Sequence, residues 1–347
     1  MAINLLDITP HQVSKDLRGY SVFFYGEPKA GKTTIATKFP NHLLLAFEKG
    51  YNALPGVMAQ PINSWTEFRQ VLKQLEKEEV KAKYETIIVD TADIAYDYCS
   101  KYVCANAPRS KEDGGGYGYD TIGDIPYGKG YGMVGNEFDT HLRKIVMMGY
   151  GLVIISHSTD KTFKDERGQE YLKIVPTLDK RANNIVARMC DIIGYARPVQ
   201  EGEVTKTYLF MRGTARFEAG SRFKHTPDYI EFNYRNLVDC IAKAIEEDEK
   251  ENGSEYFTEN RETAQRDTTT VVDFDDEFNK FNQKISYIME KVGEDKFGET
   301  FAGKVTQIVE RYLGKGSKVA NCNRDQVEAL VLINDDLNDL IKNEVGE

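Results

Sequence analysis

The chain has 347 residues, with 45 Lys and Arg against 55 Asp and Glu, and its formal net charge is -10. This acidic balance excludes a whole-molecule affinity for nucleic acid or anionic membrane, so such a contact would need a local basic patch. The length allows one large core, or one core and a small appendage.

No apolar run is long enough to span a bilayer, and the N-terminus MAINLLDITPHQ lacks a basic segment followed by a long apolar one. We therefore expect no membrane partner and a cytosolic location. The five cysteines are odd in number and include no C-x-x-C pair. They indicate reduced thiols rather than a disulfide or zinc framework. Residues 1–18 are polar and predict an N-terminal arm.

The stretch that begins at Gly26 fits the pattern G-x-x-x-x-G-K-[ST]. It follows a strand-like run at 20–25 and precedes a helix-like run that can continue to Pro40. Glycines let the backbone wrap closely, so that N–H groups and the start of the helix face phosphates. The pattern predicts an ATP site with Lys32 over the β and γ phosphates and Thr33 on Mg²⁺, the alternative being a plain glycine turn. The predicted nucleotide-binding residues are Gly26, Glu27, Pro28, Lys29, Ala30, Gly31, Lys32, Thr33 and Thr34.

Two further strands are predicted after this loop. The apolar run 42–47 is the first, and a helix with a capping-box spacing from Ser64 to Glu67 follows it. The second is 86–90, which ends in Asp90 and predicts a carboxylate beside the Mg²⁺. Thr91 and Asp93 either assist by hydrogen bonding or cap the next helix.

The segment 108–135 is rich in Gly and Tyr and predicts a long loop, which either stacks on single-stranded bases or is a mobile lid or a packed surface loop. A buried strand at 151–157 then ends in His157, which predicts a sensor of the γ phosphate, or simply a cap. The residues that follow are locally basic and indicate either a phosphate-contacting surface or an ordinary solvated loop. The basic residues are Lys161, Lys164, Arg167, Lys173, Lys180, Arg181 and Arg188.

Antiparallel strands are predicted at 191–196 and 206–211. Arg212, Arg216 and Arg222 follow them and either reach a neighbouring subunit's nucleotide or pair with carboxylates. Residues 246–275 have the acidic, polar composition of a flexible linker. The segment 276–347 carries helical apolar stripes and predicts a small all-helical C-terminal domain.

Residues 18–245 resemble the RecA-like P-loop ATPases encoded by bacteriophages, and within them the Sak-four-type group linked to single-strand annealing and recombination. The motifs that carry this resemblance are GEPKAGKTT, LLLAFEKGYNALPG, TIIVDTAD, YGKGYGMVGNEF, VIISHSTDK and RFEAGSR. It implies an α/β fold over 19–245, with a mostly parallel central sheet flanked by helices. It also implies that Glu48 polarises the attacking water. The chain departs from RecA by having His157 in place of Gln and Phe47 where an acid-small-Glu triplet is usual.

The sequence thus predicts an ATPase that needs ATP and Mg²⁺, binds single-stranded DNA and acts in phage recombination or replication. The catalytic residues are predicted to be Lys32, Glu48 and His157, and the metal ligands Thr33 and Asp90. Subunits are expected to associate into a ring or filament, and the C-terminal region to contact a phage single-strand-binding or replication protein, all in the bacterial host cytoplasm. The alternatives are a nucleotide-gated loader or scaffold that does not hydrolyse ATP, and a small-molecule kinase, for which no lid signature is visible.

Overall fold

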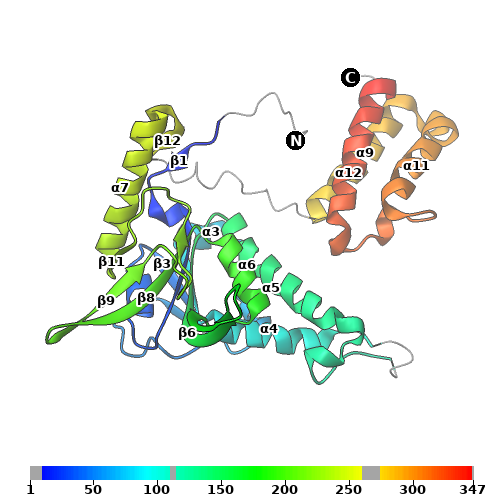
Figure 1. The fold of residues 1–347 in the computed structure, drawn as a ribbon. Coiled ribbons are helices and arrows are strands. Elements are labelled where there is room, and N and C mark those ends of the chain that lie inside the picture. Colours follow the sequence, from blue (N-terminus) through cyan, green and yellow to red (C-terminus); the bar gives the residue numbers. More distant parts are fainter. Residues whose placement is uncertain (1–9, 110–114, 260–273, 346–347) are drawn as a thin grey trace. The chain divides into compact units, whose positions relative to one another are not determined.

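The structure is a computed structural model that describes residues 10–109, 115–259 and 274–345. Contacts between residues divide the chain into two units, one comprising residues 10–268 and the other containing the C-terminal residues from 269 onward. The larger unit holds the sheet, and the smaller one is helical (Figure 1).

Among the described residues, ten strands form one sheet in the order β11-β9-β8-β2-β6-β5-β3-β4, with β10 on β8 and β7 on β6. The six strands from β8 to β4 are parallel to one another, and β7, β9, β10 and β11 pair antiparallel. Two more described strands, β1 and β12, form a separate two-stranded sheet. The bounds are β1 Val13–Ser14, β2 Ser21–Gly26, β3 His42–Ala46, β4 Ala59–Pro61, β5 Thr86–Asp90, β6 Gly151–Lys164, β7 Glu170–Pro176, β8 Ile192–Glu201, β9 Val204–Phe210, β10 Gly220–Ser221, β11 Tyr229–Glu231 and β12 Phe257–Thr258.

Helices cover both faces of this sheet. The larger unit has α1 Lys32–Ala36, α2 Trp65–Leu75, α3 Glu78–Lys81, α4 Ala92–Asn106, α5 Lys129–Met147, α6 Lys180–Met189 and α7 Tyr234–Asn252. Alternate residues of β2 point to opposite faces. Phe23 and Tyr25 join the core formed with α2, α4, α5 and α6. Val22 and Phe24 join the core formed with α1 and α7. The predicted α/β fold with a mostly parallel sheet is therefore confirmed.

The α-helices of the C-terminal unit are α9 Phe274–Val292, α10 Glu294–Lys296, α11 Ala302–Leu313 and α12 Val327–Leu340, and a π-helical turn, η6 Phe297–Phe301, joins α10 to α11. Its helices bury a separate apolar core that includes Ile288, Phe301 and Leu337. These residues lie on the apolar stripes expected from the sequence, so the prediction of C-terminal helices is confirmed. In the part of the chain that the structure describes, no helix is long and apolar enough to cross a membrane.

The helix after the phosphate loop ends at Ala36, so the expected continuation to Pro40 was wrong. The amides of Lys38 and Phe39 bond to carbonyls three residues earlier, at 3.0 and 3.1 Å. The bonds therefore have the spacing of a tight turn rather than of an α-helix.

The predicted Gly/Tyr loop was also wrong over its second half, because α5 already begins at Lys129. The glycines there serve close packing rather than a loop. A Cβ on Gly130 would lie 2.4 Å from the carbonyl oxygen of Ile122, and one on Gly135 would lie 2.7 Å from Cδ of Arg181. Both positions thus admit only glycine without a shift. Residues 110–114 of the predicted loop lie outside the described residues.

The predicted linker 246–275 was wrong at both ends, since α7 continues to Asn252 and α9 starts at Phe274. Beyond α7, the short strand β12 pairs in parallel with β1. The described part of the predicted arm therefore forms β1 and contributes the buried Leu17 to the core. Residues 1–9 and 260–273 lie outside the described residues.

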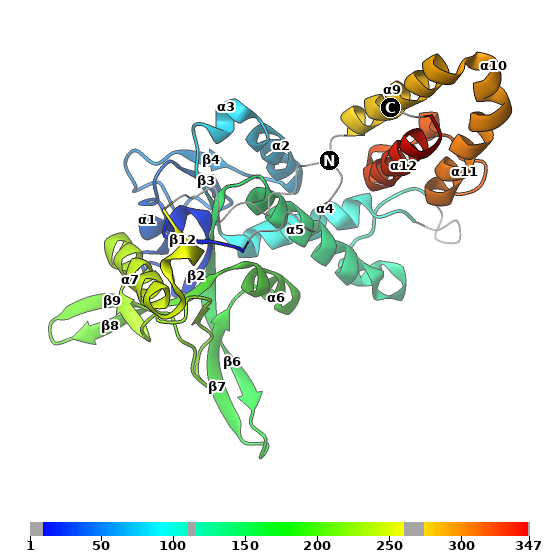
Figure 2. The same cartoon turned by 90° about the horizontal axis from the view of Figure 1, so that it is seen from above.

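The strand predicted at 151–157 is longer than expected. β6 runs to Lys164 and pairs with β7 over seven residue pairs, from Ser158↔Pro176 to Lys164↔Glu170. Figure 2 shows β6 and β7 continuing as a two-stranded ribbon beyond the rest of the sheet. Much of the basic segment after His157 is therefore a hairpin followed by α6, not a loop.

Candidate nucleotide site

The phosphate loop begins where β2 ends. β2 lies between β6 and β8 and is buried along its whole length. Gly26 is its last residue, and a Cβ there would lie 2.2 Å from the carbonyl oxygen of Ala196 on β8. Gly31, just before α1, has φ of 86°, a left-handed conformation that favours glycine. The two glycines of the motif thus have different physical roles, one in packing and one in turning the chain.

Lys32 lies inside the loop. Its side chain is buried, and Nζ donates hydrogen bonds to the carbonyl oxygens of Gly26 and Glu27, at 2.8 and 2.7 Å. Burial lowers the pKa of Lys32 to about 8, partly offset by nearby carboxylates including those of Asp90 and Glu48. The ammonium group is therefore held among the loop carbonyls with little water to solvate it.

Thr33 and Asp90 are in direct contact, although 57 residues separate them. Thr33 Oγ1 donates to Asp90 Oδ2 over 2.7 Å. Asp90 is the last residue of β5, and only 3% of it is exposed. Burial raises the pKa of Asp90 to about 6, against the hydrogen bond from Thr33. Its other oxygen, Oδ1, is buried and has no hydrogen-bond partner among the described residues.

An unpartnered carboxylate oxygen beside a threonine hydroxyl fits a hard divalent cation. Mg²⁺ takes oxygen ligands, typically one or two from protein side chains with phosphates and waters completing the octahedron. A buried polar atom without a partner is unfavourable in a folded protein, and a bound cation would remove that penalty. Thr33 and Asp90 could therefore hold the ion that a triphosphate needs.

Glu48 and His157 form a second contact at the same edge of the sheet. Glu48 follows β3, and its amide points to the carbonyl oxygen of Asp90 at 3.3 Å. His157 lies on β6 opposite Gly26. Glu48 Oε2 and His157 Nε2 are 3.6 Å apart. Pairing with the imidazole lowers the pKa of Glu48, and pairing with the carboxylate raises the pKa of His157.

Asp93 links this edge to the residue that directly follows β7, through contacts that the sequence did not reveal. Its Oδ1 accepts hydrogen bonds from the Ser156 hydroxyl, at 3.0 Å, and from the Thr177 hydroxyl. Asp93 thus does not cap α4, and its assistance to the Mg²⁺ site stays a prediction. Thr177 was missed because it is 84 residues from Asp93, and no local pattern marks a lone threonine. Thr91 occupies the N-cap position of α4 without a side-chain cap bond.

Together these contacts place four candidate residues at one edge of the parallel sheet. Lys32, Glu48 and Asp90 lie at or beyond the carboxyl ends of β2, β3 and β5, and His157 is the last β6 residue that pairs in parallel with β2. This is the edge at which open parallel sheets bind ligands. The fold and this constellation define a P-loop protein of the RecA-like type. Residues 18–223 match the family described as AAA domain, and the chain belongs to that family.

A full-length relative connects the chain to phages. The chain is 33% identical over 353 residues to the SPbeta prophage-derived uncharacterized protein YorG of Bacillus subtilis (strain 168), and the match covers 98% of this chain and 99% of that protein. The predicted resemblance to phage RecA-like P-loop proteins is confirmed, whereas membership of the Sak-four-type group stays a prediction.

Two solved structures are also similar to the chain, both at 13% identity and a TM-score of 0.34. One is a KaiC-like protein, PH0186, from Pyrococcus horikoshii OT3, which matches over 62% of this chain and 86% of its own. The other is the RadB recombinase, which matches over 63% of this chain and 90% of its own.

Proposed function

We propose that the protein is an ATPase that uses ATP and Mg²⁺ and acts on single-stranded DNA during phage recombination or replication. The observation that carries the nucleotide half is the contact of Thr33 with Asp90 beside the buried Lys32, with one Asp90 oxygen left without a partner among the described residues. The AAA-domain match and the prophage relative support the assignment of class and source.

In this proposal the loop from Gly26 to Thr34 wraps the phosphates with its amides. Lys32 moves from the loop carbonyls to the β and γ phosphates. Thr33 and Asp90 hold Mg²⁺, which neutralises charge on the phosphate oxygens. Glu48 accepts a proton from a water molecule as the water oxygen attacks the γ phosphorus. The bond between the γ phosphorus and the bridging oxygen of ADP breaks, and ADP and phosphate are released.

His157 is proposed to sense this reaction. It pairs with Glu48 and lies on β6, the strand that continues into the β6–β7 hairpin. A change in the Glu48 contact would therefore reach the hairpin through a single strand. Asp93 connects β6 with the residue that directly follows β7, through Ser156 and Thr177.

The β6–β7 hairpin is the first proposed DNA contact. Phe163 and Tyr171 lie side by side on it, with ring centroids 6.0 Å apart, and both are more than a third exposed. Lys173 Nζ lies 5.7 Å from the Phe163 ring. Exposed aromatic rings beside lysines can stack on bases and contact phosphates without sequence preference. The positive charge of the hairpin is partly neutralised, because Lys164 pairs with Glu170.

The Gly/Tyr segment is the second proposed contact. Tyr117 is 75% exposed and Tyr127 is 94% exposed, far more than tyrosines that serve packing. Lys129 Nζ lies 5.7 Å from the Tyr127 ring. These features favour base stacking over a role in packing.

Arg216 is the proposed arginine that completes a neighbouring subunit's site in a ring or filament. Arg212 donates to the carbonyl oxygens of Phe223 and Lys224, and Arg222 pairs with Asp191, so both have internal roles. The Arg216 side chain has no ion pair or hydrogen bond among the described residues and borders a cavity of about 810 Å³. Mixing Arg216→Ala with the Lys32→Ala variant should restore turnover at mixed interfaces if the arginine acts in trans. Arg235→Ala, an exposed arginine on α7, is the control.

The central experiment measures ATP turnover with and without single-stranded DNA across salt concentrations. We expect stimulation by DNA that fades as salt rises, because phosphate contacts release counterions. A Phe163→Ala and Tyr171→Ala double variant should keep basal turnover and lose the stimulation. Turnover without any DNA response would refute the DNA half and leave the ATPase half standing.

A further inference from the structure

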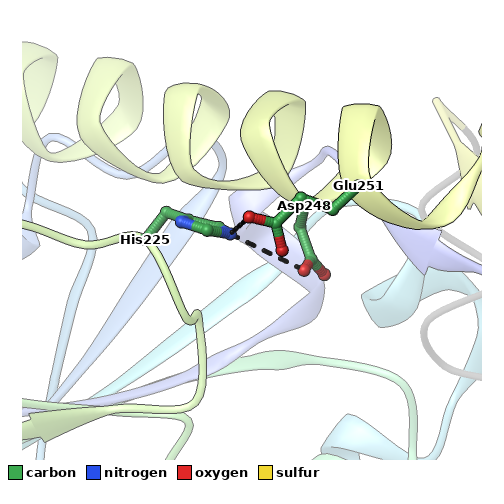
Figure 3. A group of neighbouring side chains, drawn as sticks. All are labelled: His225, Asp248 and Glu251. Atoms are coloured by element: carbon green, nitrogen blue, oxygen red, sulfur yellow. Dashed lines mark ion pairs between the residues drawn. The ribbon is translucent and has the colours of Figure 1, made fainter.

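A histidine and two carboxylates meet away from the nucleotide edge, where α7 ends (Figure 3). Asp248 and Glu251 are three residues apart on α7, and therefore lie on the same face of the helix. His225 comes from the loop between β10 and β11 and points toward them. One ligand atom from each of the three side chains lies within 4.8 Å of the others.

We propose that His225, Asp248 and Glu251 bind a divalent transition-metal ion, with zinc as the best fit. Imidazole nitrogen with carboxylate oxygens suits Zn²⁺, whereas Mg²⁺ and Ca²⁺ prefer oxygen ligands alone. Three protein ligands leave a fourth tetrahedral position, which water can fill. Of the three ligands, Asp248 borders a cavity of about 220 Å³.

The arrangement of the individual atoms favours a metal over a plain ion pair. His225 Nε2 is buried and has no hydrogen-bond partner in the part of the chain that the structure describes. It lies 3.4 Å from Glu251 Oε1 and 3.9 Å from Asp248 Oδ1, both beyond good hydrogen-bond length. Zinc ligands lie about 2.0–2.2 Å from the ion, so small side-chain rotations would bring the three atoms to bonding distance.

Each of the two carboxylates also accepts a hydrogen bond from a neighbouring side chain. Lys224 Nζ donates to Glu251 Oε2, which leaves Oε1 toward His225. Asn252 Nδ2 donates to Asp248 Oδ1 at 3.0 Å, and this is the same oxygen that lies 3.9 Å from His225 Nε2. Such outer contacts orient ligating carboxylates, and the lysine reduces the negative charge of the cluster. A metal therefore need not displace Lys224.

A bound ion would tie the loop at 222–227 to the end of α7. The same loop accepts the hydrogen bonds of Arg212 through the carbonyl oxygens of Phe223 and Lys224. The ion would thus fix the base of the segment that carries Arg216. This role is structural, and it does not depend on the nucleotide proposal.

The test uses the full-length chain, stripped with a chelator and free of nucleotide, titrated with Zn²⁺ in competition with a chromogenic zinc indicator. We expect one tight site per chain, and a rise in the melting temperature with zinc. His225→Ala and Glu251→Gln should each weaken binding at least tenfold and lose the thermal shift. Glu251 lies at the exposed end of α7, so its variant is expected to fold.

Two control variants test whether zinc binds this site and not other carboxylates of the chain. Glu247→Gln removes an exposed carboxylate next to Asp248 and should leave zinc affinity unchanged. Asp90→Asn alters the nucleotide edge and should also keep the tight zinc site. Wild-type protein without a tight site would overturn the proposal, as would zinc binding that survives Glu251→Gln or disappears in Asp90→Asn.

Discussion

Asp90, at the carboxyl edge of the sheet, and Glu277, in the C-terminal helical unit, are both buried acids with different surroundings. Asp90 accepts one hydrogen bond, from Thr33, and burial raises its pKa to about 6. The Glu277 carboxylate accepts hydrogen bonds from Lys280 Nζ and from Asn334 Nδ2. Burial acts to raise the pKa of Glu277, but these two donors outweigh it and lower the pKa.

Buried acids that stabilise the fold and buried acids that bind a ligand therefore have different hydrogen-bond surroundings in this molecule. A buried acid that serves structure is surrounded by donors that offset its desolvation. At the sheet edge, Asp90 Oδ1, Asp93 Oδ2 and His157 Nδ1 are all buried without hydrogen-bond partners among the described residues. Such groups are unfavourable for folding and suit a surface that acquires partners on binding.

The largest effect is expected for Glu48→Gln. Loss of a general base should slow ATP turnover by about 10²–10⁴-fold while ATP stays bound, because the amide cannot accept the proton. Steady-state turnover and equilibrium binding of a fluorescent ATP analogue measure the two quantities. Glu277→Gln, the matched change in the helical unit, should leave turnover unchanged. Negligible wild-type turnover that Glu48→Gln does not alter would favour the non-hydrolysing loader or scaffold.

The second prediction concerns Lys32 and pH. Its pKa of about 8 in the free protein means that the ammonium loses its proton above that pH, whereas bound phosphates would hold it charged. Affinity for ATP should therefore fall as pH rises above 8, by up to about tenfold per unit. Calorimetric titrations from pH 7 to 10 measure this slope. Lys32→Arg should show no slope, whatever its absolute affinity, because guanidinium stays charged.

The third prediction compares the two buried acids directly. The folded-state pKa of Asp90 is raised, so its stability contribution is fully present below the unfolded value near 3.8 and lost as pH rises through about 6. Asp90→Asn should therefore stabilise the free protein at pH 7, by about 1–3 kcal/mol. Glu277→Gln should destabilise the helical unit by about 1–3 kcal/mol, since it weakens charge-assisted hydrogen bonds.

Urea unfolding can separate these two effects. Trp65 is the single tryptophan and lies in the larger unit, so its fluorescence reports Asp90→Asn. Far-UV circular dichroism follows the helices of both units and reports Glu277→Gln. Changes of the same sign in the two variants would break the contrast between the regions.

Much of the fold was predictable because its signals are local. The phosphate loop, the strand ending in Asp90 and the Ser64 cap each occupy a few consecutive residues. The hairpin continuation of β6 was missed because residues 158–164 are mostly exposed and polar, without the apolar alternation that marks a half-buried strand. The early start of α5 was missed because close contacts with distant segments favour its glycines.

The candidate site was predictable as a set of residues but not as a network. Asp90, Glu48 and His157 end or follow predicted strands, and parallel strands bring such ends to one edge. The partners of each group depend on distant residues, as Asp93 does on Thr177. The lowered pKa of Lys32 depends on burial, which only the folded chain creates. The catalytic and metal roles themselves stay predictions.

The smallest effect on stability is expected for His157→Gln. The contact with Glu48 joins two side chains that are each about a third exposed, at 31% and 32%, so it should contribute less than about 1 kcal/mol. The pKa of His157 is raised, so this contribution is present below the unfolded value near 6.5 and lost as pH rises through the folded value. Urea unfolding at pH 6 and pH 9 should show a difference from wild type only at the lower pH.

If His157 also senses the γ phosphate, the variant will keep basal ATP turnover within about tenfold and lose stimulation by single-stranded DNA. Retained stimulation would mean that His157 only pairs with Glu48, and that other residues couple the nucleotide site to the β6–β7 hairpin.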